Sequence, residues 1–97
     1  MINYIPHGAA NAKPRKEIIK DMALDGFKIS DRAFRNTINR MILDKDALIC
    51  TTSHKGYYIP DTPEDVEINT RECNSRISKL IARREAVKTM ALERGIL

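Results

Sequence analysis

Apolar residues at helical spacing predict a short helix near the start of the chain. Ile18 and Met22 recur at a period near 3.6 residues, between Pro14 and the pair at 25–26, Asp-Gly. Proline suits a first helical turn because its missing amide hydrogen would be unpaired there, and glycine tolerates the conformation that ends many helices. We therefore expect a helix from near Pro14 to Asp25.

A second, more amphipathic helix is expected to begin at Ser30, since serine is a favoured N-cap and Asp31 would follow in the first turn. The apolar side chains of this helix follow one stripe: Phe34, Ile38, Met41 and Ile42. The opposite face carries arginine and asparagine without a glutamate: Arg32, Arg35, Asn36, Asn39 and Arg40. Between the two helices, Phe27 or Ile29 would fill the space.

Two short β-prone runs follow, at 48–52 and 57–59, and Gly56 before the second run suits a hairpin turn. Successive strand residues point to opposite faces, so one of Tyr57 and Tyr58 is expected in the core and the other at the surface.

The last third of the chain predicts one long helix. The segment 62–65, Thr-Pro-Glu-Asp, combines an N-cap, a first-turn proline and first-turn acids. The helix would run from Pro63 to about Arg94, before a glycine. Residues 69–70 and 74–75 are poor helix formers, so a helix that is interrupted there is the alternative.

This last helix also carries the 4-3-4-3 spacing of a coiled-coil seam. Its positions are Val66, Thr70, Cys73, Ile77, Leu80, Arg84, Val87, Ala91 and Arg94. We expect Val66, Cys73 and Ile77 to pack on the core, and the distal end to outrun it and pair with a second copy. The residues expected at that contact are Leu80, Ile81, Arg84, Val87 and Ala91. Antiparallel pairing is preferred, because parallel pairing would place Arg84 against its own copy. A disordered or partner-bound tail is the alternative.

Composition and charge refine this picture. The 97 residues suit one small domain, which we divide into an N-terminal arm (1–13), a central unit (14–61) and the long helix (62–97). The net charge is +4, and residues 1–60 hold ten lysines and arginines against six acids. A basic first part is compatible with a polyanionic partner.

Several classes are disfavoured. Apolar runs are too short to cross a bilayer and no signal-peptide stretch is present, so we expect a cytoplasmic protein without a membrane partner. Cys50 and Cys73 are expected to be reduced and buried. No pair of cysteines or histidines has zinc-ligand spacing, and no glycine-rich phosphate loop or nucleophile elbow occurs. We expect neither a metal, a cofactor nor an enzymatic activity.

The expected order of elements is helix, turn, polar-faced helix, hairpin, helix. This mainly α layout with a small β-hairpin (α+β) is that of a winged helix-turn-helix followed by a long C-terminal helix. In that design the second helix enters the major groove, where arginine pairs with guanine and asparagine with adenine.

Three stretches also carry a resemblance to a known group. They are Ile29-Ser30-Asp31-Arg32 at the start of the second helix, Leu48-Ile49-Cys50-Thr51-Thr52, and Lys55-Gly56-Tyr57-Tyr58-Ile59. Residues 4–67 resemble small winged helix-turn-helix DNA-binding proteins of phages and prophages of Gram-positive bacteria. The resemblance implies sequence-specific DNA binding in phage transcription control or DNA replication. The chain departs from that group in that the helix expected before the helix pair is nearly missing.

The expected partners are double-stranded DNA and a second copy of the chain. Recognition would use the helix at about 30–44 and the wing at about 48–60, with Ser30 at a phosphate. The residues expected at DNA are Ser30, Arg32, Arg35, Asn36, Asn39, Arg40, His54 and Lys55. The alternative is a protein-interaction adaptor or phage replication accessory protein, which an exposed apolar patch on the second helix would favour.

Overall fold

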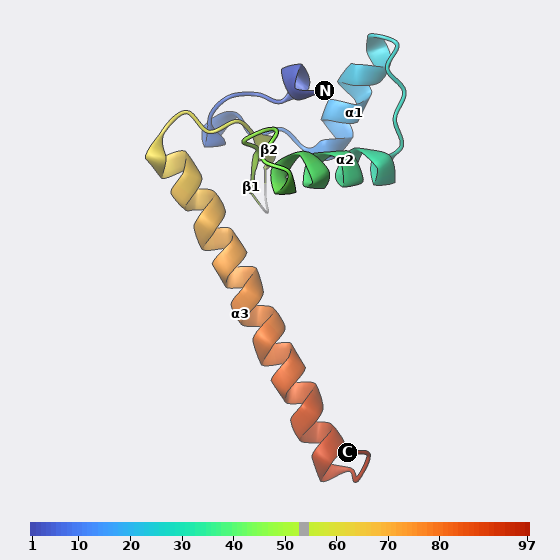
Figure 1. The fold of residues 1–97 in the computed structure, drawn as a ribbon, viewed down its shortest axis with the longest axis vertical. Coiled ribbons are helices and arrows are strands. Elements are labelled where there is room, and N and C mark those ends of the chain that lie inside the picture. Colours follow the sequence, from blue (N-terminus) through green and yellow to red (C-terminus); the bar gives the residue numbers. More distant parts are fainter. Residues whose placement is uncertain (53–54) are drawn as a thin grey trace.

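Three α-helices and a two-stranded antiparallel hairpin make up the part of the chain that the computed structural model describes, residues 1–52 and 55–97. The elements are α1 (Arg15–Leu24), α2 (Asp31–Leu43), β1 (Cys50–Thr52), β2 (Gly56–Tyr58) and α3 (Pro63–Glu93). Short 3-10 turns at Ile2–Tyr4 and Ala9–Asn11 precede them. The predicted class, mainly α with a small hairpin and a long last helix, is confirmed (Figure 1).

The helix pair begins and ends where local chemistry places it. The Ser30 hydroxyl oxygen accepts a hydrogen bond from the Ala33 amide at 3.1 Å, which confirms the predicted N-cap of α2. Of the predicted stripe of α2, Phe34 and Ile38 are buried, and the other two side chains are half-buried. Ile29 packs against this core, whereas Phe27 is 60% exposed. Ile29 therefore fills the space between the helices.

The hairpin pairs Thr51 with Tyr57 and leaves Tyr58 completely buried. Tyr57 is half-buried and meets the Phe34 ring edge-on, with the ring centroids 5.5 Å apart. Burial, together with Cys50 and Asp65 nearby, raises the pKa of Tyr58 to about 12. Its phenol therefore stays protonated and donates a hydrogen bond to the Asp65 carbonyl at 2.6 Å.

The first thirteen residues, predicted as an N-terminal arm, contribute two buried side chains to the core. Ile5 and Ala9 are buried, and the Gly8 amide donates to the Ile59 carbonyl at 2.8 Å. Lys13 and Tyr57 exchange two backbone hydrogen bonds, at 2.9 and 3.0 Å. The segment thus adds an edge to the hairpin, whose unpaired backbone groups it satisfies. Its non-periodic sequence gave no sign of this, because the contacts are made largely by the backbone.

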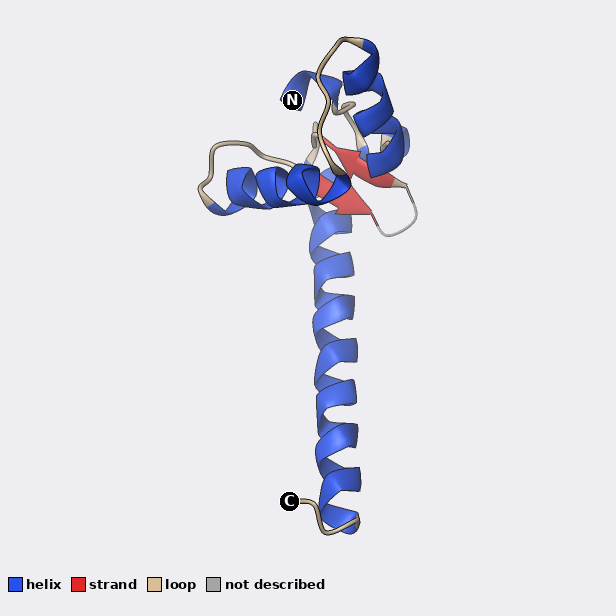
Figure 2. Cartoon of the chain, turned by 90° about the vertical axis from the view of Figure 1, so that its right-hand side faces the viewer, coloured by secondary structure: helices blue, strands red, loops and turns tan. Residues whose placement is uncertain are grey.

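The last helix is continuous through both pairs of poor helix formers and ends before Gly95, whose φ is +73°. It leaves the remaining elements, here called the head, and projects far beyond them (Figures 1 and 2). The radius of gyration is accordingly 17.3 Å, against about 12.5 Å for a compact chain of this length. Within the described residues, no helix is both long and apolar enough to cross a membrane.

The first turns of α3 contact the head through a different face from the one that the predicted coiled-coil seam indicated. The predicted core residues Val66 and Ile77 are 39% and 54% exposed, so their assignment to the core was wrong. Ile68 instead packs beside the hairpin, and the Asn69 side-chain oxygen accepts from the Thr51 amide at 3.0 Å. That bond satisfies an amide on the free edge of β1.

Asp65 fixes the start of α3 to the N-terminal segment. Its carboxylate accepts hydrogen bonds from the backbone amides of Ala9 at 3.2 Å and Asp61 at 3.0 Å. These bonds hold the pKa of the Asp65 carboxyl below its usual range, because they stabilise the charged form. The Thr62 hydroxyl caps the same turn by accepting from the Asp65 amide at 3.2 Å.

Candidate nucleic-acid interface

The outward face of α2 carries the polar residues that the sequence placed there. All five are exposed: Arg32, Arg35, Asn36, Asn39 and Arg40. The buried stripe on the other side of α2 fixes this orientation, because Phe34 and Ile38 pack into the head. The exposed face of α2, a helix that the structure describes in full, bears no large apolar side chain before Leu43.

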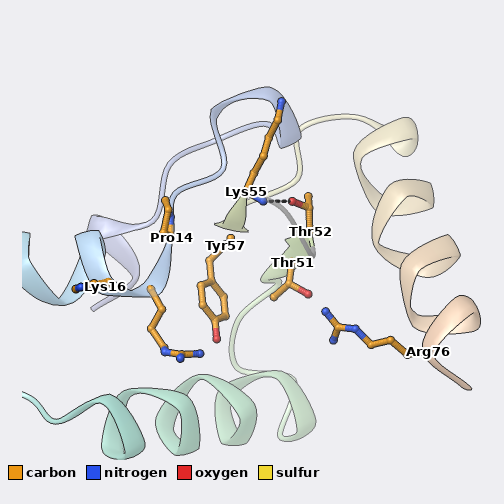
Figure 3. A pocket seen from close by; sticks show the side chains of 9 residues that line it. Pro14, Lys16, Thr51, Thr52, Lys55, Tyr57 and Arg76 are labelled. Carbon is orange, nitrogen blue, oxygen red and sulfur yellow. Dashed lines mark hydrogen bonds between the residues drawn. The ribbon is translucent and has the colours of Figure 1, made fainter. Parts of the chain in front are cut away.

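A hollow of about 470 Å³ opens between the start of α1, the hairpin and α3 (Figure 3). Four of its lining residues are cationic: Arg15, Lys16, Lys55 and Arg76. The hydroxyl-bearing side chains of Thr51, Thr52 and Tyr57 complete the polar part of the wall. Among the described residues that line this hollow, none is a carboxylate. The surface therefore favours an anion.

A second hollow, of about 430 Å³, adjoins the first along α2. The two share Thr51, Tyr57 and Arg76. The second adds polar side chains, Arg35, Asn36 and Asn39 from α2 and Asn69 from α3, and its floor is apolar, with Ile38, Ile42, Ile49 and Cys73. We call the two adjoining hollows the basic groove. None of the described residues that line the second hollow carries a carboxylate either.

The side chains in the groove do not all point the same way. Figure 3 shows Arg76 reaching from α3 toward Thr51, and the Tyr57 hydroxyl pointing toward α2. The ammonium group of Lys55 points away from both, while its backbone amide donates to the Thr52 hydroxyl at 2.9 Å. Arg76 thus faces the centre of the groove, and Lys55 extends from its rim.

One carboxylate outside the lining organises two of the arginines. Asp31, at the start of α2, forms an ion pair with Arg15 of α1 through one oxygen and with Arg35, at 3.3 Å, through the other. Hydrogen bonds to Asp31 and to Tyr57 raise the pKa of Arg15. Asp31 therefore holds two guanidinium groups near the groove and neutralises part of their charge.

The groove collects some of the predicted DNA-contact residues and adds others. Arg35, Asn36, Asn39 and Lys55 line it, whereas Ser30, Arg32 and Arg40 are exposed on α2 or at its start but do not. The predicted contact of His54 lies outside the described residues. Sequence reasoning missed Arg15, Lys16 and Arg76. Arg15 and Lys16 directly follow Pro14, so their place in the first turn of α1 could have been predicted. Arg76 lies in a different part of the chain.

The residues predicted at a dimer contact lie on the projecting half of α3. Leu80, Ile81 and Val87 are 62%, 46% and 56% exposed. Arg84 forms an ion pair with Glu85 at 3.1 Å. Ala91 is half-buried, and its carbonyl accepts from the backbone amide of residue 96 at 2.9 Å as the chain turns back after α3. Three of the five residues therefore present an uncovered apolar surface.

The cysteines divide differently from the prediction. Cys50 is buried, and burial raises the pKa of its thiol, whereas Cys73 is exposed, which corrects the expectation that both are buried. In the parts of the chain that the structure describes, no group of three or more histidine, cysteine or acidic side chains is placed to hold a metal ion. Comparisons with protein-family models, curated proteins and solved structures found no match.

Proposed function

We propose that this chain binds double-stranded DNA through α2 and the hairpin, in the manner of a winged helix-turn-helix. In this proposal α2 enters the major groove, and Asn39 and Arg35 read base edges. Lys55 and Arg76 contact the flanking phosphates, which position the protein on the duplex without reading its sequence. The Ser30 hydroxyl lies at the start of α2, where a further phosphate is favoured.

The observation that carries the proposal is the basic groove itself. Arginine, asparagine and lysine residues of α1, α2, the hairpin and α3 line one surface, and no carboxylate is among its described lining residues. A duplex carries regularly spaced phosphates beside hydrogen-bonding base edges, and this combination of cations and amides matches both features. The bonds between Lys13 and Tyr57 also support the layout, since they place a third extended segment beside the hairpin.

The resemblance to phage and prophage proteins supports a regulator of transcription in the cytoplasm, and a phage replication accessory protein is an alternative. The rival proposal is an adaptor that uses the same head as a docking surface for another protein. An adaptor surface of that kind is expected to expose apolar side chains at its centre. Up to Leu43, the exposed face of α2 carries arginine and asparagine instead, which favours DNA.

We also propose that the chain acts as a homodimer through the projecting half of α3. A single head covers a short half-site, and two-fold pairing doubles the contacts available for specificity. The exposed side chains of Leu80, Ile81 and Val87 supply an apolar surface for such pairing. An antiparallel arrangement keeps Arg84 away from its own copy.

The test of DNA binding begins with a duplex site recovered by selection from a random-sequence library with the full chain. Asn39→Ala and Arg35→Ala are expected to weaken binding to that site by about 1–3 kcal/mol and to relax its sequence preference, because each removes a base contact. Lys55→Ala is expected to weaken binding to selected and random duplexes equally, because it removes only a phosphate contact. Fluorescence anisotropy measures all four proteins.

The matched control is Arg71→Ala, which removes an exposed arginine of α3 that lines neither hollow. It is expected to bind like the wild type within a factor of about two, because surface charges away from the contact contribute little. Equal losses on selected and random DNA for Asn39, Arg35 and Lys55 variants would contradict the assignment of α2 as the recognition helix.

A further inference from the structure

Charge is segregated along α3 and its flanking residues. Residues 61–75 contain five acids and one base, whereas residues 76–97 contain six bases and two acids. The change of sign falls at Arg76, where α3 leaves the head and lines the basic groove. The half of α3 that projects from the head is therefore strongly basic.

Three of these bases form a row that starts in the groove. Arg76, Lys79 and Arg83 are spaced by three and four residues, which places them on one side of a helix. We call this row the α3 basic stripe. All three are exposed, and none has a carboxylate within ion-pair distance among the described residues, whereas Arg84 is paired with Glu85.

The stripe lies beside the surface proposed for DNA. Figure 1 shows α3 beside the hairpin where it leaves the head, with α2 on the other side of the hairpin. Arg76 shares a hollow with Arg35, Asn36 and Asn39 of α2. A rod-shaped polyanion that rests on α2 therefore meets the root of α3, and the stripe continues from that point for roughly 10 Å, since a helix rises 1.5 Å per residue.

We infer that the α3 basic stripe is a second contact to the phosphate backbone of the same duplex. This inference rests on the proposed DNA binding and extends it beyond the groove, to Lys79 and Arg83. The stripe and the apolar residues Leu80, Ile81 and Val87 centre roughly a quarter turn apart on α3, given 3.6 residues per turn. Arg83 borders Leu80 and Val87, so the stripe runs along the edge of the apolar surface proposed for pairing.

The test compares two double variants of the full chain. Lys79→Gln with Arg83→Gln removes two charges from the stripe, and Arg71→Gln with Lys88→Gln removes one arginine and one lysine of α3 that line neither hollow of the basic groove. Both variants have the same net charge, and circular dichroism checks that α3 remains helical. Binding to a random-sequence duplex is titrated over a series of salt concentrations.

The stripe variant is expected to reduce the slope of log affinity against log salt by about 1.8, because each lost phosphate contact removes about 0.9. Its affinity at low salt should fall roughly tenfold or more, and the control should keep the wild-type slope. Equal losses in both variants would show an effect of net charge alone and overturn the inference. An unchanged slope in the stripe variant, as expected if the stripe binds an acidic protein, would overturn it too.

The outcomes separate this inference from the proposal beneath it. If the wild-type chain binds no duplex at low salt, both fail together. If the wild type binds and Lys55→Ala weakens binding while the stripe variant does not, the groove contacts DNA and the stripe beyond Arg76 does not.

Discussion

Gly56 is the residue at which the hairpin meets the start of α1. Its φ is +109°, a conformation that residues with a side chain rarely adopt. A Cβ atom built there would lie 2.1 Å from the Lys13 carbonyl oxygen and 2.7 Å from the Pro14 Cα. Both are backbone atoms, so neither can move aside as a flexible side chain would.

Gly56→Ala is therefore expected to lower the free energy of unfolding by on the order of 2 kcal/mol or more, since backbone strain and a clash act together. Gly26→Ala is the matched control, because Gly26 also has a positive φ (+90°) but nothing lies within 4 Å of the added atom. That control should cost roughly 1 kcal/mol. Urea unfolding followed by circular dichroism measures both, and equal losses would contradict the close approach at Gly56.

At this scale the sequence predicts residues whose partners are near in the chain. The caps of Ser30 and Thr62 bond to amides three residues away, so residue type and position suffice to place them. Asn69 was interpreted only as a poor helix former, yet it bonds to Thr51, eighteen residues earlier. Arg76 was missed for the same reason, because its place in the groove depends on how α3 leaves the head.

Among the elements, α3 best separates what the sequence could predict from what it could not. The start and end of α3 follow from a capped first turn and a C-terminal glycine, and both were predicted. Its contact face was not, because the head is held by Asp65, Ile68 and Asn69, of which two are polar. An apolar repeat cannot reveal a contact made by hydrogen bonds, so the seam through Val66, Cys73 and Ile77 missed it.

The proposed pairing of α3 predicts that replacing apolar residues on its seam by polar ones disrupts the dimer. Leu80→Gln with Val87→Gln is expected to convert a dimer into a monomer, because both residues lie on the seam and are more than half exposed. Leu92→Gln is the matched control, since Leu92 is equally exposed, at 62%, but lies off the seam. Sedimentation equilibrium at micromolar concentrations distinguishes the states. A monomeric wild type, or a double variant that remains dimeric, would contradict the proposal.

The whole molecule combines a small head with a helix that extends well beyond it (Figure 2). The class of fold was predictable from helical periodicity and turn residues, but the burial of the N-terminal segment was not, because that segment joins the hairpin through backbone bonds. The groove also exists only at this scale, since its walls come from four elements. The polar face of α2 predicted Arg35, Asn36 and Asn39, and the fold adds residues of α1 and α3.

The central claim is that this molecule binds duplex DNA through cationic contacts, and a salt titration tests it most directly. A labelled random-sequence duplex is titrated with the full chain at about 50 and 200 mM salt. If about five phosphates are contacted, the affinity should fall by roughly 10²–10³-fold between the two conditions. Absence of binding at the lower salt concentration, or an affinity that does not change with salt, would contradict the account.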